Sequence, residues 1–385
     1  MTPPRILQLD SMLMGGGTDD QIAKLARALH GATPSVWVAG PDGRVFSKII
    51  RDLGVPFHVT PPEGLAGVRF IPAVARFIRR EKIQILHAHH GRDYWPAVLA
   101  ARLAGTKPKI VLTRHMAKSP ASFASRRFLL GQCDALIAVS EFVAKVLREG
   151  VYEPQSPEPE RRARPPLRGN HAKIHVIPGG IDAAQFRPAD AADKRRELGL
   201  QPGDYAFAVA GGYDLPRGKG QRGFLAAAAR LHEKIPRARF LIIGGGSMAE
   251  VLQADIARLG LGGKAWLTGH ASDMPQVMNA IDCLVHPQIG TEAFPLVTCE
   301  AQACGKPVIA SALDGIPETL VDPNWSTLVP PESIAALEQA MLSWAARDRP
   351  DDAQRRELHE KLAARFSWAV VVERVLAVYR NLLVG

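Results

Sequence analysis

Residues 205–213, YAFAVAGGY, form a short apolar run that ends in two glycines, as a buried strand of a parallel sheet does. Helical patterns follow at residues 221–234 and 248–259. Four more strand-like runs alternate with them: RFLIIGGG (239–246), AWLTGH (265–270), CLVHPQ (283–288) and PVIASA (307–312). Such alternation predicts a parallel sheet with helices on both faces, so this half of the chain is expected to be a doubly wound α/β domain.

The same alternation runs through the first 140 residues. Helical patterns at residues 18–30 and 44–54 lie among five strand-like runs: RILQLD (5–10), SVWVAG (35–40), QILHAHH (84–90), KIVLTRH (109–115) and DALIAVS (134–140). A chain of 385 residues exceeds what one hydrophobic core usually serves. We therefore predict an α/β protein with two Rossmann-like domains whose parallel sheets face each other across a cleft. Ligands of such sheets bind at the carboxyl ends of the strands, so the cleft is the expected site.

We predict an N-terminal domain of residues 1–182, which binds the acceptor, and a C-terminal domain of residues 183–367, which binds the donor. Residues 152–170 are rich in proline and arginine and show no apolar period, which predicts a flexible insertion. Residues 368–385 are expected to form a helix that packs on the N-terminal domain. The apolar face of this helix is expected to consist of Val371, Val375, Val378, Tyr379 and Leu382.

The sequence shows no apolar run long enough to span a membrane and no apolar core of a signal peptide, so a cytoplasmic location is expected. The four cysteines lack C-x-x-C spacing and are expected to be reduced core residues. Residues 1–185 carry 26 Lys and Arg against 15 Asp and Glu, whereas residues 186–385 carry 22 against 23. The uneven charge favours an anionic partner for the first half: a phosphorylated acceptor, a membrane surface or nucleic acid. Charge that serves solubility alone is the alternative.

The stretch HPQIGTEAFPLVTCEAQACGKPVIAS, residues 286–311, places Glu292 and Glu300 with seven residues between them. If a helix begins between the two, Glu300 falls about one and a half turns into it. The free amides of Leu296 and Val297 can then hold a diphosphate while a carboxylate binds ribose hydroxyls. The same pattern also fits an ordinary helix start with an acid that the helix dipole favours.

Two glycine-rich loops follow predicted strands. One carries Arg217 and Lys219, and cations on such a loop suit a pyrophosphate, which arginine can bind through two parallel hydrogen bonds. The other contains Gly15, Gly16 and Gly17, which let the backbone approach a ligand closely. Each loop also fits an ordinary tight turn.

Other polar side chains lie near predicted strand ends. Thr18 or Asp19 is the expected cap of the helix that follows the first glycine loop. His87, His89 and His90 lack the spacing of a tetrahedral metal site, so we interpret them as core or cleft residues with His90 nearest the site. No metal ligands are predicted.

The ordered set of segments resembles the retaining glycosyltransferases of family 4, also called glycosyltransferase group 1, which have the two-domain GT-B fold. The resemblance covers nearly the whole chain. It rests on the glycine loop at 15–17, LHAHH (86–90), LTRH (112–115), AVSEFVAKVL (138–147), IHVIPGGIDAAQFRP (174–188), Lys219-Gly220, LIIGGGS (241–247), LTGHASDMPQVMNAIDCLVHP (267–287), the Glu292 and Glu300 motif, and FSW (366–368).

The resemblance implies a role for each matching residue. Glu292 would bind hydroxyls of the donor sugar, Lys219 and Arg217 the diphosphate, Glu300 the ribose, and His115 would lie beside the sugar. Of these, Glu292, His115, Lys219 and Arg217 form the implied catalytic set. The other implied donor-binding residues are Gly16, Gly17, Gly212, His270, Asp273, Phe294, Leu296 and Val297. The chain departs from the family at Gly212, where relatives often carry arginine, at Gly179, where asparagine is usual, and at Thr18-Asp19, where glutamate is usual.

The resemblance implies transfer of a hexose or similar sugar, with retention, from a nucleoside-diphosphate sugar to a hydroxyl of a cell-envelope glycan, such as a lipopolysaccharide, or of a lipid-linked acceptor. Front-face attack, in which the leaving phosphate helps to deprotonate the acceptor, would need no obligatory protein base. Cations and helix amides would stabilise the departing diphosphate. The resemblance implies no cofactor and no metal. An anionic membrane surface, on the inner face of the membrane, is an implied further partner, whereas nucleic acid is not an implied partner.

Rival functions have weaker support. Gly244, Gly246 and Ala249 follow a strand in the order G-x-G-x-x-A of a nicotinamide-dependent oxidoreductase, but the next strand ends without the acidic residue that this fingerprint needs. A nucleic-acid-binding protein would suit the basic first half, but aromatic residues make up only 6% and no reading motif appears. A sugar-nucleotide epimerase or a phosphorylase of similar architecture is an alternative that the Glu292 and Glu300 pair disfavours.

Overall fold

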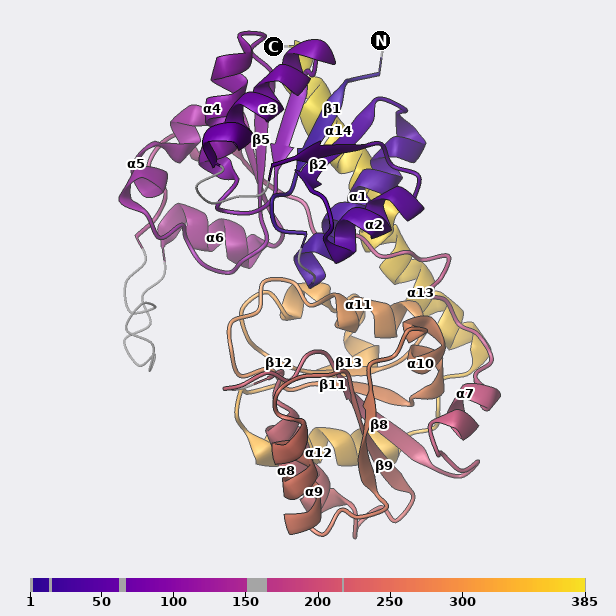
Figure 1. The fold of residues 1–385 in the computed structure, drawn as a ribbon. Helices are drawn as coiled ribbons and strands as arrows, with labels where there is room; N and C mark the ends of the chain where they lie inside the picture. The colour runs from indigo at the N-terminus through magenta and orange to yellow at the C-terminus, as the bar shows by residue number, and fades with distance from the viewer. Residues whose placement is uncertain (1–2, 14–15, 62–66, 151–164, 217, 385) are drawn as a thin grey trace. The chain divides into compact units, whose positions relative to one another are not determined.

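A computed structural model describes residues 3–13, 16–61, 67–150, 165–216 and 218–384 of the chain. It divides into two compact units (Figure 1). Unit 1 consists of Met1–Gly180 and Trp368–Gly385, and unit 2 of Ile181–Ser367. The first crossing therefore falls two residues before the predicted boundary, and the last helix belongs to the first unit. Most of the segment predicted as a flexible insertion, together with Gly15 and Arg217, lies outside the described residues.

Unit 1 contains a seven-stranded parallel sheet in the order β3-β2-β1-β4-β5-β6-β7. Every residue of β1, β4 and β6 is buried, because helices cover both faces of the sheet. The elements are β1 (Ile6–Leu9), α1 (Gly17–Ala32), β2 (Val36–Pro41), α2 (Val45–Asp52), β3 (Phe57–Thr60), α3 (Gly67–Arg80), β4 (Ile85–Ala88), α4 (Tyr94–Ala104), β5 (Lys109–Arg114), α5 (Phe123–Gln132), β6 (Ala135–Ala138), α6 (Glu141–Glu149), η2 (His171–Lys173), β7 (Ile174–Val176) and α14 (Trp368–Val384).

The last helix, α14, supplies a large part of the core of unit 1. Val371, Val375 and Tyr379 are buried in one apolar cluster with Leu25 of α1 and Val111 of β5. These α14 positions recur at helical spacing, as the apolar pattern of the sequence predicts. The helix also reaches the polar centre of the unit, because the Tyr379 hydroxyl is fully buried there.

Unit 2 contains a six-stranded parallel sheet in the order β10-β9-β8-β11-β12-β13. Helices α8, α9 and α12 share one apolar core with the sheet, and α11 packs against α13. The elements are α7 (Ala192–Glu197), β8 (Tyr205–Ala210), α8 (Gln221–Leu231), β9 (Ala238–Ile243), α9 (Ala249–Arg258), β10 (Ala265–Gly269), α10 (Met274–Ala280), β11 (Cys283–His286), α11 (Leu296–Ala303), β12 (Val308–Ser311), η3 (Pro317–Thr319), η4 (Pro323–Trp325), β13 (Ser326–Val329), α12 (Ile334–Ala345) and α13 (Asp352–Phe366).

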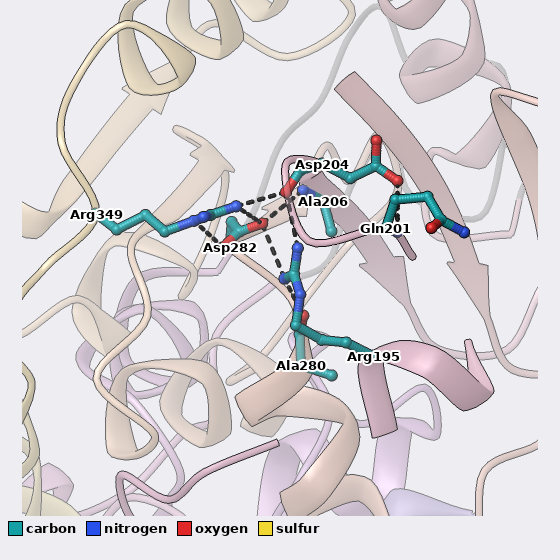
Figure 2. Close-up of polar contacts among 7 residues, drawn as sticks. All are labelled: Arg195, Gln201, Asp204, Ala206, Ala280, Asp282 and Arg349. Atoms are coloured by element: carbon teal, nitrogen blue, oxygen red, sulfur yellow. Dashed lines mark hydrogen bonds and ion pairs between the residues drawn. The ribbon is translucent and has the colours of Figure 1, made fainter. Parts of the chain in front are cut away.

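An ion cluster around the buried Asp282 lies at the end of this sheet where β8 and β11 begin (Figure 2). Both oxygens of Asp282 are used. Arg349 Nε donates to Oδ1 at 2.7 Å, and Arg195 Nη1 donates to Oδ2 at 3.1 Å. The backbone amide of Ala206 also donates to Oδ2, at 2.7 Å, and both guanidinium groups donate to the carbonyl of Asp204. The cluster therefore ties α7 and the segment after α12 to two central strands.

Two classes of sequence expectation were wrong in detail. Strands β3, β7 and β13 were not identified as strands. All three lie at sheet edges, and β3 and β13 each have only one buried residue, so they lack the apolar run that marks a central strand. Thr18 and Asp19 do not cap α1: Gly16 is the N-cap residue and makes no side-chain hydrogen bond.

Candidate functional site

The carboxyl ends of the unit 2 strands bring together the two loops that carry the predicted charges. Lys219 follows β8 and Glu292 follows β11, and these strands are neighbours in the sheet. Lys219 Nζ lies 2.6 Å from Glu292 Oε2, although the residues are 73 positions apart. The Glu292 backbone amide donates to Asp314 Oδ2 at 3.1 Å, which fixes the loop from the other side. The pair leaves 36% of the lysine side chain exposed, so Lys219 lies partly at the surface of this loop.

Helix α11 begins beside this pair in the chain and has no side-chain cap among the described residues. Its N-cap is Pro295, so Leu296 and Val297 supply the first amides, and such unpaired amides favour anions. The helix is held by Thr298, whose hydroxyl donates to the Pro295 carbonyl at 2.7 Å and lies 2.7 Å from Thr319 Oγ1. Glu300 is the fifth residue of α11 and is partly exposed.

Glycines let the loops at the carboxyl ends of the unit 2 strands approach each other. A Cβ on Gly220 would lie 1.9 Å from the carbonyl oxygen of Pro287, and one on Gly244 would lie 2.3 Å from that of Gly211. Gly246 is pressed equally closely against Tyr213. Backbone packing between neighbouring loops therefore explains the G-x-G-x-x-A pattern without a dinucleotide.

The remaining unit 2 candidates differ in exposure. His270 and Asp273 are exposed after β10, and Asp273 caps α10 by accepting from the Gln276 amide. Gly212 lies in the loop that Gly244 contacts. Phe294 is buried and packs edge to face on Phe366, with ring centroids 5.3 Å apart, so it supports the loop as a core residue.

Sequence reasoning missed His286, which lies at the end of β11. Its ring is buried, Nε2 lies 4.0 Å from Glu292 Oε2, and neither ring nitrogen has a hydrogen-bond partner among the described residues. Burial lowers the pKa of His286 to about 4, so the ring is neutral near pH 7. The sequence signal was its position directly after a strand, the same signal that marked the histidines of the first half.

In unit 1, His115 lies at the end of β5 in a chain of polar side chains. Gln8 Nε2 donates to the Tyr379 hydroxyl, so Gln8 Oε1 accepts from His89 Nε2 at 2.5 Å. His89 Nδ1 is then the acceptor for His115 Nε2 at 3.3 Å. Burial lowers the pKa of His115 to about 3, with the charges of His90 and Arg114 acting in the same direction. The network therefore holds a neutral His115 whose Nδ1 is an acceptor.

Tyr379 and His87 extend the same network to α14. The tyrosine hydroxyl lies 2.6 Å from His87 Nδ1, and His87 Nε2 lies 2.6 Å from Thr113 Oγ1. A cavity of about 30 Å³ adjoins these side chains and is also lined by Gly179 and Gly180. His87 and His89 are therefore core residues, as predicted from the sequence.

His90 belongs to a second cluster in unit 1. His90 Nε2 lies 2.9 Å from Asp19 Oδ1 and 3.4 Å from Asp10 Oδ1. Burial opposes the charge on His90, but hydrogen bonds to the two carboxylates outweigh it and raise its pKa to about 10. One ligand atom from each of these residues lies within 4.8 Å of the others, a spacing that could hold a metal ion. The raised pKa makes His90 a cation near pH 7, and this charge lies beside the two carboxylates.

Asp93 lies beside this cluster and predicts a pH dependence. Burial raises its pKa to about 7, above the ordinary value of 3.8. The folded state therefore binds a proton that the unfolded state loses, and this stabilisation is present below pH 3.8 and disappears as the pH rises through about 7. Asp93→Asn can still accept the Ser11 amide and does not titrate.

We expect the free energy of unfolding of wild type, relative to Asp93→Asn, to fall by about 3–4 kcal/mol between pH 4 and pH 7. Urea titrations of both proteins across this range measure the difference. A constant difference would contradict the buried, protonated Asp93.

Two family models match separate parts of the chain. "Glycosyltransferase Family 4" matches residues 15–155, and "Glycosyl transferases group 1" matches residues 205–347. A D-inositol 3-phosphate glycosyltransferase of Segniliparus rotundus is 35% identical over 55% of this chain and 48% of that protein. A phosphatidyl-myo-inositol mannosyltransferase of Mycolicibacterium smegmatis is 25% identical over 95% of this chain and 90% of that protein. The chain thus spans about half the length of the first of these relatives.

Solved structures share the fold. A glycosyltransferase from Rickettsia africae superposes with a TM-score of 0.84 at 20% identity, over 100% of this chain and 99% of that one. Anabaena Alr3699/HepE in complex with UDP gives 0.79 at 19% identity, over 98% of this chain and 100% of that one. The two Rossmann-like units are those of the GT-B fold.

Proposed function

Because the chain belongs to the group 1 glycosyltransferases of family 4, we propose that it transfers a sugar from a nucleoside-diphosphate sugar to a hydroxyl group. One observation carries the proposal: Lys219 and Glu292, far apart in sequence, meet at 2.6 Å at the carboxyl end of the sheet. Helix α11 starts there, and none of the described side chains caps it. A cation and helix amides suit a diphosphate, and a neighbouring carboxylate suits sugar hydroxyls.

The donor roles follow from this arrangement. The Leu296 and Val297 amides and Lys219 bind the diphosphate, Glu292 binds hydroxyls of the sugar, and Glu300 binds the ribose. Lys219 and Glu292 neutralise each other in the structure. When the donor binds, Lys219 pairs with the diphosphate and Glu292 with hydroxyls of the sugar. His270 and Asp273 are exposed after β10, where they can flank the base.

The chemical step uses charge stabilisation. As the glycosidic bond breaks, negative charge grows on the departing diphosphate, and Lys219 with the α11 amides stabilises it in place. The proposal therefore needs no metal. Transfer is with retention, and the leaving phosphate accepts the proton of the acceptor hydroxyl. His115, neutral and fixed by His89, offers its Nδ1 to a sugar hydroxyl.

The acceptor is proposed to be a phosphorylated or lipid-linked molecule of the cell envelope, reached from the cytoplasmic side of the membrane. The names of the relatives, which refer to inositol 3-phosphate and phosphatidyl-myo-inositol, support this class. The positive charge of residues 1–185 supports it independently.

Calorimetry with UDP, GDP and ADP tests the donor site. We expect one nucleoside diphosphate to bind wild type, with UDP favoured by the Anabaena complex. Glu300→Ala should weaken binding roughly 10- to 100-fold, because hydrogen bonds to a charged group contribute about 1.5–3 kcal/mol each. Glu250→Ala, an exposed glutamate on α9, serves as the control. If no nucleotide binds, or if Glu300→Ala binds as wild type does, the assignment fails.

A further inference from the structure

Helices α4 and α5 of unit 1 expose large apolar side chains to solvent. Leu99 and Leu103 of α4 are 45% and 53% exposed, and Phe123 and Phe128 of α5 are 70% and 48% exposed. These four residues define the α4–α5 surface. Together with Met116 they make up five of the twelve large apolar side chains exposed to this degree among the described residues. Such clustering, unlike scattered exposed leucines, marks an interaction surface.

The two helices form one continuous surface. They connect β4 to β5 and β5 to β6, which are successive neighbours in a parallel sheet, so right-handed crossovers place both on the same face (Figure 1). Trp95 Nε1 donates to Ser125 Oγ at 2.9 Å, and the Arg102 guanidinium donates to the Gln132 side chain. The rings of Phe123 and Phe128 meet edge to face, with centroids 6.5 Å apart.

The chain segment that contains both helices carries charge of one sign. Residues 94–133 contain seven lysines and arginines and no aspartate or glutamate. Arg102, Lys107 and Arg127 are exposed, and the Arg127 guanidinium lies over the Phe128 ring, 5.5 Å from its centroid. Arginine beside an exposed aromatic ring can place its charge at lipid phosphates while the ring enters the acyl boundary.

We propose that the α4–α5 surface docks on an anionic lipid bilayer. An acidic protein is the competing partner, because its charge would also complement a segment that offers only cations over 40 residues. The exposed rings of Phe123 and Phe128, with the Arg127 guanidinium over one of them, favour the bilayer, because such rings can enter the acyl boundary. A uniformly negative bilayer matches that charge. None of the described helices is long and apolar enough to cross a membrane, so the attachment is peripheral.

The position of the surface also suits the acceptor. Helix α5 follows β5 and the loop that begins with His115, so Phe123, its first residue, is on the chain segment leaving the carboxyl end of the sheet. Docking of the α4–α5 surface would therefore hold the carboxyl end of the unit 1 sheet near lipid-linked acceptors. This use of the surface rests on the proposed function, whereas binding to the bilayer does not.

Vesicle flotation of the full chain tests the proposal. Vesicles of phosphatidylcholine alone are compared with vesicles that contain about 30% phosphatidylglycerol, at about 50 mM and about 500 mM salt. We expect wild type to float only with anionic vesicles, and less at high salt. Phe123→Ser with Phe128→Ser should weaken binding about tenfold or more, and each of Arg102→Gln and Arg127→Gln about fivefold.

Matched controls are available in the same unit. Val45 is 66% exposed and Lys48 is exposed, both on α2, so Val45→Ser and Lys48→Gln should bind vesicles as wild type does. The proposal is overturned if wild type fails to float with anionic vesicles at low salt, or if the phenylalanine variant binds like Val45→Ser. Calorimetry with UDP on the same proteins separates the two assignments, because surface variants should keep nucleotide binding and Glu300→Ala should keep vesicle binding.

Discussion

Lys219→Ala is expected to lower the turnover number roughly 10²- to 10³-fold, the loss typical of removing one group that stabilises charge in the transition state. Lys219 lies on the loop after β8, and its ammonium group is 2.6 Å from the Glu292 carboxylate. The effect is measured as release of nucleoside diphosphate from sugar donors that carry the nucleotide identified by calorimetry. Binding of the nucleotide should weaken by a smaller factor, because the charge on the diphosphate grows as the bond breaks.

The variant also leaves Glu292 without its partner, so stability has to be measured alongside turnover. Lys219→Met combined with Glu292→Gln removes both charges, and its free energy of unfolding shows whether an unpaired carboxylate destabilises Lys219→Ala. Lys194→Ala is the matched control, since Lys194 makes an ion pair of the same 2.6 Å length with Glu197 on α7. Unchanged turnover in Lys219→Ala would remove this residue from the mechanism.

Asp282→Ala is expected to destabilise unit 2 by about 2–3 kcal/mol, less than the full cost of breaking a buried ion pair, because the Arg195 and Arg349 side chains are 19% and 44% exposed. Asp282 is only 6% exposed and serves three donors, so its loss leaves two guanidinium groups and the Ala206 amide without this acceptor. Urea unfolding of the variant measures the change. The free energy of unfolding of Asp282→Asn should lie between those of Asp282→Ala and wild type, because the amide oxygen can still accept the Ala206 hydrogen bond.

The control for Asp282 is an exposed pair of the same chemistry. Asp193 and Arg196 form an ion pair on α7 with 91% and 72% of their side chains exposed. Asp193→Ala should cost less than about 1 kcal/mol. Equal effects in the two aspartate variants would show that burial does not set the strength of the Asp282 cluster.

The sequence predicted central strands well because burial on both faces requires continuous apolar runs. β8, with all six residues buried, is the clearest example. Edge strands β3 and β13 escaped prediction because they are half-covered and need no such run. The cap of α1 was wrong for another reason: Asp19 has the right residue type, but its carboxylate is used by His90.

For the candidate site, the sequence identified Lys219, Glu292 and the start of α11, because charged residues after strands and a proline at a helix start leave local signals. It could not show that Lys219 and Glu292 meet, since this depends on the order of strands in the sheet. It also could not show that Phe294 is buried against Phe366, whereas the neighbouring candidates Glu292 and Leu296 are partly exposed. His286 was missed because its neighbour Glu292 comes close to it only when the loop between them folds back.

The position of α14 sets the order in which the protein can be completed on the ribosome. Unit 2 is one continuous stretch, so all its residues have been synthesised before Trp368 is added. Unit 1 begins earlier but lacks Val371, Val375 and Tyr379 of its core until translation reaches the last helix. Unit 1 therefore departs from the N-terminal-first order common in multidomain proteins, because its core can close only after all of unit 2 has been synthesised. Until then, the apolar surface of unit 1 that α14 covers, which includes Leu25 of α1, stays without this helix.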